Sequence, residues 1–159
     1  MSFYAQSKCI VQEISKILNA QNKTLSVAES CTGGKISSAI TSVSGSSNYF
    51  KGALIAYSNS IKINQLAVKV EDIQKHSSVS EKVAMQMAEG IKNQFQTDYA
   101  IATTGYAGPK GEKVGQVFIA LASTEKTIVM DCFFEGERKE IVNKASIKAL
   151  TILLSEIKK

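Results

Sequence analysis

The order of hydrophobic and polar positions predicts alternating helices and strands. Apolar residues recur every three to four positions, as in an amphipathic helix, over residues 9–18, 36–43, 61–66, 83–95 and 141–153. Short apolar runs predict strands over residues 25–28, 52–57, 99–103, 116–122 and 127–134, of which 52–57 is expected to be buried. The last two lie close enough in sequence to form an antiparallel hairpin. We therefore expect one α/β domain over residues 1–159, a three-layer α/β/α arrangement with a mixed sheet.

Polar residues at the expected helix starts support this order. The Ser-Asn-Ser segment at 58–60 is expected to cap the short helix over residues 61–66. Ser78, followed three residues later by Glu81, fits a capping box at the start of the longer helix. The last helix is expected to begin near Glu137.

Composition narrows the class of protein. A chain of 159 residues that is 44% apolar can bury one substantial core. No segment approaches the ~20 apolar residues of a membrane span, and the first residues lack the basic-then-apolar order of a signal peptide. We therefore expect a cytoplasmic protein that does not bind membranes. Because Cys9, Cys31 and Cys132 are far apart and His76 is the single histidine, neither a disulfide framework nor a metal site is favoured.

The net charge of +5 raises the question of a nucleic-acid partner. The lysines are scattered rather than gathered in a basic run with interleaved aromatic residues, which makes nucleic-acid binding an unfavoured alternative. The positive electrostatic field of a protein with this net charge would attract a small anionic substrate as well as it would attract a nucleic acid.

The segment Ala28-Glu29-Ser30-Cys31-Thr32-Gly33-Gly34 places a hydroxyl group where a strand turns into a helix. Its glycines permit a tight backbone turn, and free N–H groups from Cys31 to Gly34 are suited to hold a phosphate or the oxyanion of acyl transfer. These features make Ser30 a candidate nucleophile. The alternative is that Ser30 or Thr32 merely caps the helix.

Three expected strand ends carry polar groups that a mixed sheet can bring together: Ser30, the 57–59 segment Tyr-Ser-Asn, and Thr104. A serine nucleophile needs a base, and a single histidine in a polar setting does not favour a Ser-His-Asp triad. Lys62 lies among apolar residues, and partial burial lowers a lysine pKa toward neutrality. Lys62 is therefore the candidate base, with an ordinary solvated lysine as the alternative.

Several motifs occur in an order and at a spacing that resemble the CinA C-terminal domain family, from about residue 8 to the C-terminus. They are Ala28-Glu29-Ser30-Cys31-Thr32-Gly33-Gly34, Ser44-Gly45-Ser46-Ser47, Tyr57-Ser58-Asn59-Ser60-Ile61-Lys62, His76-Ser77-Ser78-Val79-Ser80-Glu81 and Thr104-Gly105-Tyr106-Ala107-Gly108-Pro109. The resemblance implies a cofactor-free amidase that hydrolyses nicotinamide mononucleotide to nicotinate mononucleotide and ammonia.

The resemblance also implies roles for individual residues. Ser30 would be the nucleophile, Lys62 the general base and Tyr57 its hydroxyl neighbour. The expected substrate-binding residues are Cys31, Thr32, Gly33, Gly34, Asn59, Thr104, Gly105 and Arg138. The expected partner is a small nucleotide, and the protein is expected to form a homo-oligomer, a dimer or higher.

The sequence departs from the family pattern at two places, and these departures leave open the possibility that the domain is not an active amidase. Only residues 110–113 separate Gly108-Pro109 from Val114-Gly115, the pair that opens the next strand, where the family usually has a longer glycine-rich insertion. The last helix has Arg138 but carries Val142 where the family commonly has a second arginine. Lys110, Lys113 or Lys139 would then supply the missing charge. The alternative is a weakened or inactive domain that binds nucleotides or regulates, and a nucleic-acid accessory role ranks below it.

Overall fold

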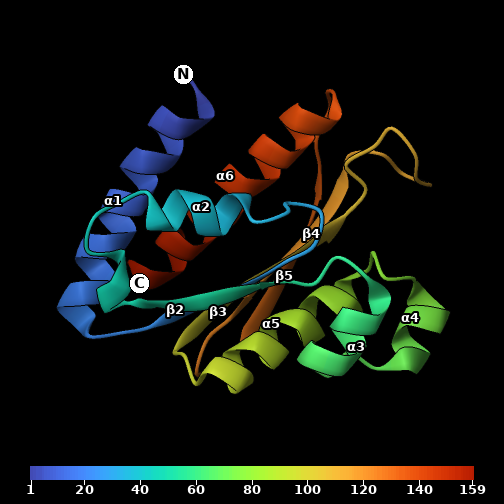
Figure 1. Cartoon of the computed structure of the whole chain (residues 1–159), viewed down its shortest axis with the longest axis horizontal. Coiled ribbons are helices and arrows are strands. Elements are labelled where there is room, and N and C mark those ends of the chain that lie inside the picture. Colours follow the sequence, from blue (N-terminus) through green and yellow to red (C-terminus); the bar gives the residue numbers. More distant parts are fainter.

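A five-stranded mixed sheet with strand order β2-β1-β3-β4-β5 separates the helices into two layers (Figure 1). The computed structural model describes residues 1–159. Its strands are β1 Leu25–Glu29, β2 Phe50–Ile55, β3 Tyr99–Gly105, β4 Gln116–Ala122 and β5 Thr127–Phe133. Its helices are α1 Phe3–Gln21, α2 Lys35–Thr41, α3 Asn59–Leu66, α4 Val70–His76, α5 Glu81–Phe95 and α6 Arg138–Ile157, with a 3₁₀ turn η1 at Ser46–Asn48. The predicted α/β fold class is confirmed.

The two faces of the sheet carry side chains of different size. Branched residues such as Val27, Ile101 and Ile119 face α1, α2 and α6 and form the larger core cluster. Alanines dominate the opposite face of the same strands, among them Ala102 and Ala120, and they pack against α3 and α5. Because small side chains let a helix approach closely, α5 packs directly against β1, β3 and β4. Helix α3 in turn packs against α5.

The direction of the strands decides where a site can form. β1 pairs in parallel with both β2 and β3, whereas β4 and β5 continue the sheet in antiparallel fashion. The carboxyl ends of three neighbouring strands therefore meet at one edge, where open α/β sheets bind ligands. Ser30 directly follows β1, Tyr106 directly follows β3, and Ser58 comes three residues after the end of β2.

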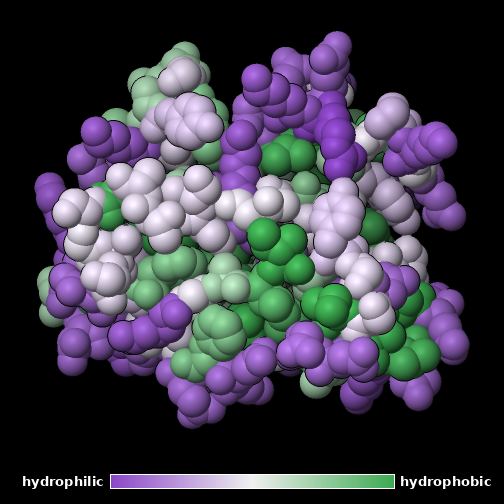
Figure 2. Space-filling view, viewed as in Figure 1, coloured by the Kyte–Doolittle hydropathy of each residue, from purple (hydrophilic) through white to green (hydrophobic).

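The strand predicted over residues 52–57 as buried is corrected by the structure. β2 begins at Phe50 and ends at Ile55, and because it lies at the sheet edge with β1 as its one neighbour, it is only partly buried. Ile55 is 50% exposed and Tyr57 is 61% exposed. Figure 2 shows apolar residues across the middle of this face, where β2 runs in Figure 1. The apolar run reflected an edge strand rather than a central one.

The starts of α3 and α6 agree with the sequence, whereas the cap of α5 differs from the expected one. Ser58 caps α3 by accepting from the Ile61 N–H, as expected. The capping box expected at Ser78 does not form, because Ser80 is the N-cap residue of α5 and accepts from the Val83 N–H. Helix α4 was not predicted.

Helix α3 is held against α5 by a contact that only glycine allows. A Cβ atom added at Gly90 would lie 2.1 Å from the carbonyl oxygen of Leu66. We expect Gly90→Ala to lower the free energy of unfolding by about 1–3 kcal/mol, although alanine favours helices, because the clash is with backbone. Chemical denaturation checks this. The exposed Gln94→Ala on the same helix should stay within about 0.5 kcal/mol of wild type, and equal stability of the Gly90 variant would contradict the contact.

Candidate active site

The turn from β1 into α2 is organised by a buried carboxylate. Glu29 is fully buried, and its two oxygens accept from the N–H groups of Gly34, Ile36 and Ser37 at 2.8–3.1 Å and from the Ser37 hydroxyl at 2.6 Å. The N-cap position of α2 is Gly34, which has no side chain to cap with. Glu29 therefore caps the helix from the preceding strand, and neither Ser30 nor Thr32 does so.

This arrangement corrects the expected use of the glycine turn. The N–H of Gly34 is bonded to Glu29, and the N–H of Gly33 donates to the Ser30 carbonyl. Neither group is free for a phosphate or an oxyanion. The N–H groups of Cys31 and Thr32 make no hydrogen bond within the protein.

Ser30 and Lys62 meet at the carboxyl edge of the sheet. The Lys62 amine lies 3.0 Å from the Ser30 hydroxyl oxygen and 2.8 Å from the Ala56 carbonyl, with the Tyr57 carbonyl at 3.5 Å. Lys62 is only 2% exposed and Ser30 only 8%. Lys62 points inward because it shares the buried face of α3 with Leu66, one turn further on. It is thus not an ordinary solvated lysine.

Burial changes the protonation of two groups beside Ser30. The pKa of Lys62 is lowered because burial disfavours the charged ammonium form. Burial also raises the pKa of the neighbouring Cys31 thiol to about 12, so this sulfur stays protonated and is a poor nucleophile at neutral pH. The serine hydroxyl is therefore the nucleophile that this end of the site offers.

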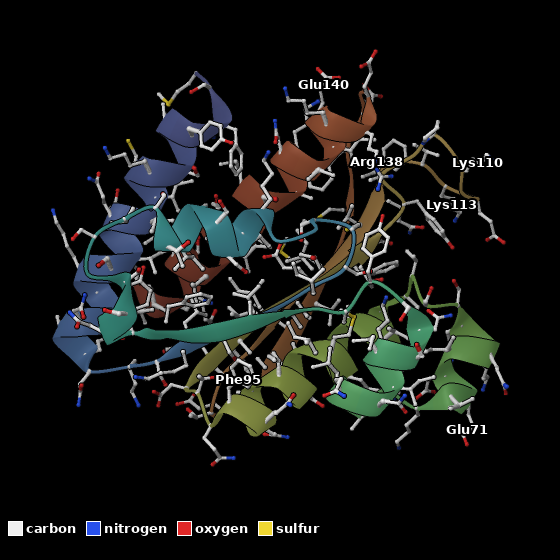
Figure 3. All side chains as sticks on the ribbon, in the orientation of Figure 1. Glu71, Phe95, Lys110, Lys113, Arg138 and Glu140 are labelled. Carbon is white, nitrogen blue, oxygen red and sulfur yellow. The ribbon has the colours of Figure 1, made fainter.

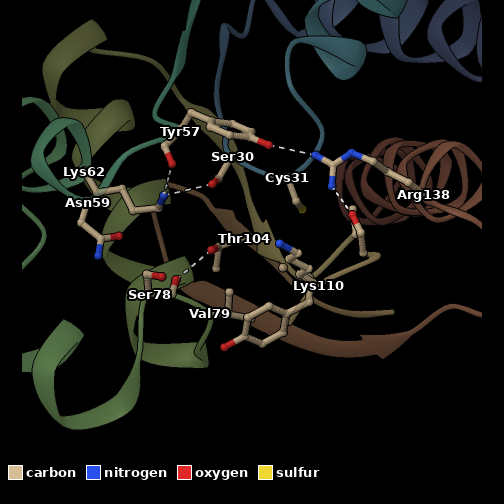
Figure 4. Close-up of a pocket in the computed structure, with 14 residues that line it drawn as sticks. Ser30, Cys31, Tyr57, Asn59, Lys62, Ser78, Val79, Thr104, Lys110 and Arg138 are labelled. Atoms are coloured by element: carbon tan, nitrogen blue, oxygen red, sulfur yellow. Dashed lines mark hydrogen bonds between the residues drawn. The ribbon is translucent and has the colours of Figure 1, made fainter. Parts of the chain in front are cut away.

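A pocket of about 240 Å³ opens above the strand ends, and Figure 4 shows its lining. The 14 lining residues are Ser30, Cys31, Tyr57, Asn59, Lys62, Ser78, Val79, Thr104, Gly105, Tyr106, Ala107, Gly108, Lys110 and Arg138. Eight of the expected site residues are thereby brought together. The lining contains three basic side chains, Lys62, Lys110 and Arg138, and no aspartate or glutamate.

Arg138 closes the end of the pocket opposite Lys62. Its guanidinium donates to the Tyr57 hydroxyl at 2.8 Å and to the Gly108 carbonyl. These two acceptors are neutral, so the charge of Arg138 has no carboxylate partner. The Tyr57 hydroxyl, expected beside Lys62, instead bonds Arg138, and the backbone carbonyl of Tyr57 is the part that approaches the lysine.

Three expected substrate-binding residues lie elsewhere. Thr32, Gly33 and Gly34 line a separate hollow that faces α1. Thr32 is buried, and its hydroxyl lies 2.8 Å from that of Thr103, so it ties the turn to β3. The turn's positive-φ glycines shape the corner rather than the pocket.

The structure shows where the residues of the short loop after Pro109 and the start of α6 lie relative to the pocket. Lys110 lines the pocket, whereas Lys113 and Lys139 do not. Figure 3 shows Lys110 and Lys113 on one loop, with Arg138 at the start of α6 beside it. Val142, one turn further along α6, packs against the larger core cluster and does not line the pocket. The expected place for a second arginine is therefore an apolar contact.

Sequence reasoning missed several residues of the site. Ser78, Val79 and Tyr106 line the pocket, although the sequence pattern predicts Ser78 to be a helix cap. The capping role of Glu29 could have been found in the sequence, because a carboxylate a few residues before a helix can accept hydrogen bonds from the first N–H groups of that helix. No three metal-binding side chains lie close together, and no helix combines the length and apolar character needed to cross a bilayer.

Comparison with known proteins places this architecture in a family. The family model described as the CinA C-terminal domain matches residues 7–157. A CinA-like protein of Flavobacterium psychrophilum is 47% identical over 151 residues, which cover 92% of this chain and 36% of that protein. A CinA-like protein of Rippkaea orientalis is 40% identical and matches 94% of this chain and 37% of its own length. The chain thus spans about a third of the length of these relatives.

Solved structures agree with the sequence comparison. The competence damage-inducible protein A of Klebsiella pneumoniae is 31% identical, with a TM-score of 0.93 over 96% of this chain and 97% of that one. The competence/damage inducible protein CihA of Agrobacterium tumefaciens is 29% identical, with a TM-score of 0.93 over 97% and 96% of the two chains. The chain therefore belongs to the CinA C-terminal domain family.

Proposed function

We propose that this protein is a serine amidase that hydrolyses the carboxamide of a small anionic nucleotide, nicotinamide mononucleotide, with Lys62 as general base. The observation that carries the proposal is the 3.0 Å contact between the buried Lys62 amine and the Ser30 hydroxyl. The activity itself comes from the family resemblance. The protein's own residues supply a nucleophile, a base and an anion-attracting pocket that suit it.

The surroundings of Lys62 prepare it to accept a proton. A neutral amine has two N–H bonds and one lone pair. The carbonyls of Ala56 and Tyr57 can accept the two N–H bonds, which leaves the lone pair directed at the Ser30 hydroxyl. Because burial lowers its pKa, Lys62 is neutral in a larger fraction of molecules than an exposed lysine would be.

The reaction then proceeds in two balanced halves. Lys62 takes the Ser30 proton as the serine oxygen bonds to the carboxamide carbon, and the Cys31 N–H is the free donor beside the developing oxyanion. The Lys62 ammonium returns the proton to the departing nitrogen, which releases ammonia and leaves an ester on Ser30. A water molecule then attacks this ester as Lys62 takes one of its protons. The Lys62 ammonium returns that proton to the departing Ser30 oxygen, which restores the serine, and the acid product loses its remaining proton to solvent to give the carboxylate.

The distribution of charge orients the substrate. Glu29 places a negative charge behind the Ser30 corner, and its helix N–H groups are already occupied. The unpaired cations Lys110 and Arg138 lie at the other end of the pocket. An anionic group is therefore favoured at the Lys110–Arg138 end, with the carboxamide at Ser30.

The decisive experiment measures ammonia release from nicotinamide mononucleotide by purified protein. We expect Ser30→Ala to abolish release, because no other activated nucleophile lines the pocket. We expect Lys62→Arg to be nearly inactive, because arginine keeps the positive charge but does not act as a base at neutral pH.

Controls for this experiment separate chemistry from folding. The circular dichroism spectra of the two variants should match that of wild type. If Ser30→Ala released ammonia as fast as wild type does, the serine mechanism would be eliminated. Tight nucleotide binding by wild type with no ammonia release would favour the nucleotide-binding or regulatory alternative.

The anionic end of the pocket can be tested with two lysines of one loop. We expect Lys110→Ala to raise KM about threefold to fivefold with little change in kcat, because an exposed cation contributes modestly to binding an anion. The effect should shrink as salt is added. Lys113→Ala is the matched control, since Lys113 lies outside the pocket. Equal kinetic changes in both variants would mean that Lys110 acts only through the overall charge.

A further inference from the structure

Ser77 has a backbone conformation that side chains rarely adopt. It ends α4 with φ 75° and ψ 158°, and its N–H donates to the Ile73 carbonyl at 2.9 Å. This region of backbone space is occupied almost entirely by glycine. A serine here is strained, and such strain persists only where neighbouring groups hold it.

Three further hydrogen bonds hold Ser77, two through its side-chain hydroxyl and one through its backbone carbonyl. The Ser77 hydroxyl lies 3.2 Å from the Tyr106 hydroxyl, across the pocket wall, and accepts from the Val79 N–H at 3.3 Å. The Ser77 carbonyl accepts from the Ser80 hydroxyl, the same group that caps α5. The strained residue is thus tied to α5 and to the loop that follows β3.

The effect of this turn is to present the next residue to the pocket. Ser78 lines the pocket, and its carbonyl accepts from the Thr104 hydroxyl at 2.7 Å. Its own hydroxyl and N–H make no hydrogen bond within the protein. Figure 4 shows Ser78 and Asn59 on the Lys62 side of the pocket, away from Lys110 and Arg138.

We propose that Ser78 is a specificity-determining residue whose hydroxyl and N–H bind a neutral polar group of the substrate, and that Ser77 is a positioning residue that holds it there. This rests on the proposed amidase function. A hydroxyl or an amide fits these donors, because the anionic group is favoured at the opposite end. In a nucleotide substrate, the ribose hydroxyls and the carboxamide are such groups.

The strain is tested by comparing two substitutions at one position. Glycine normally destabilises a folded chain relative to alanine. At residue 77 we expect the reverse, with the melting temperature of Ser77→Gly about 3–8 °C above that of Ser77→Ala, because only glycine relieves the strain. A melting temperature of the glycine variant at or below that of the alanine variant would overturn the positioning role.

The binding role of Ser78 is tested by calorimetric titration of nicotinamide mononucleotide into proteins that also carry Ser30→Ala, which prevents turnover. We expect Ser78→Ala to raise Kd about threefold to tenfold, the worth of one neutral hydrogen bond, with an unchanged melting temperature. The exposed Ser155→Ala is the control and should leave Kd unchanged. Ser77→Ala should also raise Kd, and more than Ser77→Gly does.

The outcomes separate this proposal from the amidase proposal. An unchanged Kd in Ser78→Ala overturns the role of Ser78, whatever the turnover of wild type. Nucleotide binding that depends on Ser78, in a wild-type protein that releases no ammonia, overturns only the amidase. Absence of both binding and turnover contradicts both.

Discussion

The contact between the Lys62 amine and the Ser30 hydroxyl constrains most of the structure around it. A buried lysine is costly when it is charged, so its pKa falls and its neutral form is favoured. The site keeps the amine hydrogen-bonded through two backbone carbonyls, and no carboxylate lines the pocket to hold it in the ammonium form. A carboxylate in that position would raise the lysine pKa and remove the base.

The one buried carboxylate near the nucleophile is used differently. Glu29 directs its oxygens into the start of α2, where helix N–H groups satisfy them. The corner is therefore rigid, and Ser30 is presented from a well-bonded backbone. The same N–H groups are then unavailable to an anionic substrate, which leaves Lys110 and Arg138 as its attraction at the far end of the pocket.

Periodicity predicted most of the fold because each helix and strand buries one side. Large residues alternate with alanines in β1, β3 and β4, and the long helices have clear apolar faces. The edge position of β2 was not predictable, because an apolar run does not reveal how many neighbouring strands cover it. Helix α4 has no fully buried residue, so its pattern carried no signal.

The site was predicted in part for a similar reason. Lys62 could be proposed as the base because it lies among apolar residues, but the sequence left an ordinary solvated lysine as the alternative, and only the packing of α3 shows that it is buried. The separation of Thr32 from the pocket could not, since one turn can direct neighbouring side chains to opposite sides of the sheet. The strain at Ser77 has no sequence signal, because nothing local distinguishes a serine held at positive φ from one in an ordinary turn.

The charge state of Lys62 tests the central claim most directly. Titration of the Lys62 amine by NMR on protein with isotope-labelled lysine, assigned with Lys62→Met, reports its pKa. The expected pKa is below the ordinary lysine value of about 10.4, so the amine becomes neutral, and able to take the Ser30 proton, at a lower pH than exposed lysines do. A Lys62 amine that titrates at or above the ordinary value would contradict its role as the base.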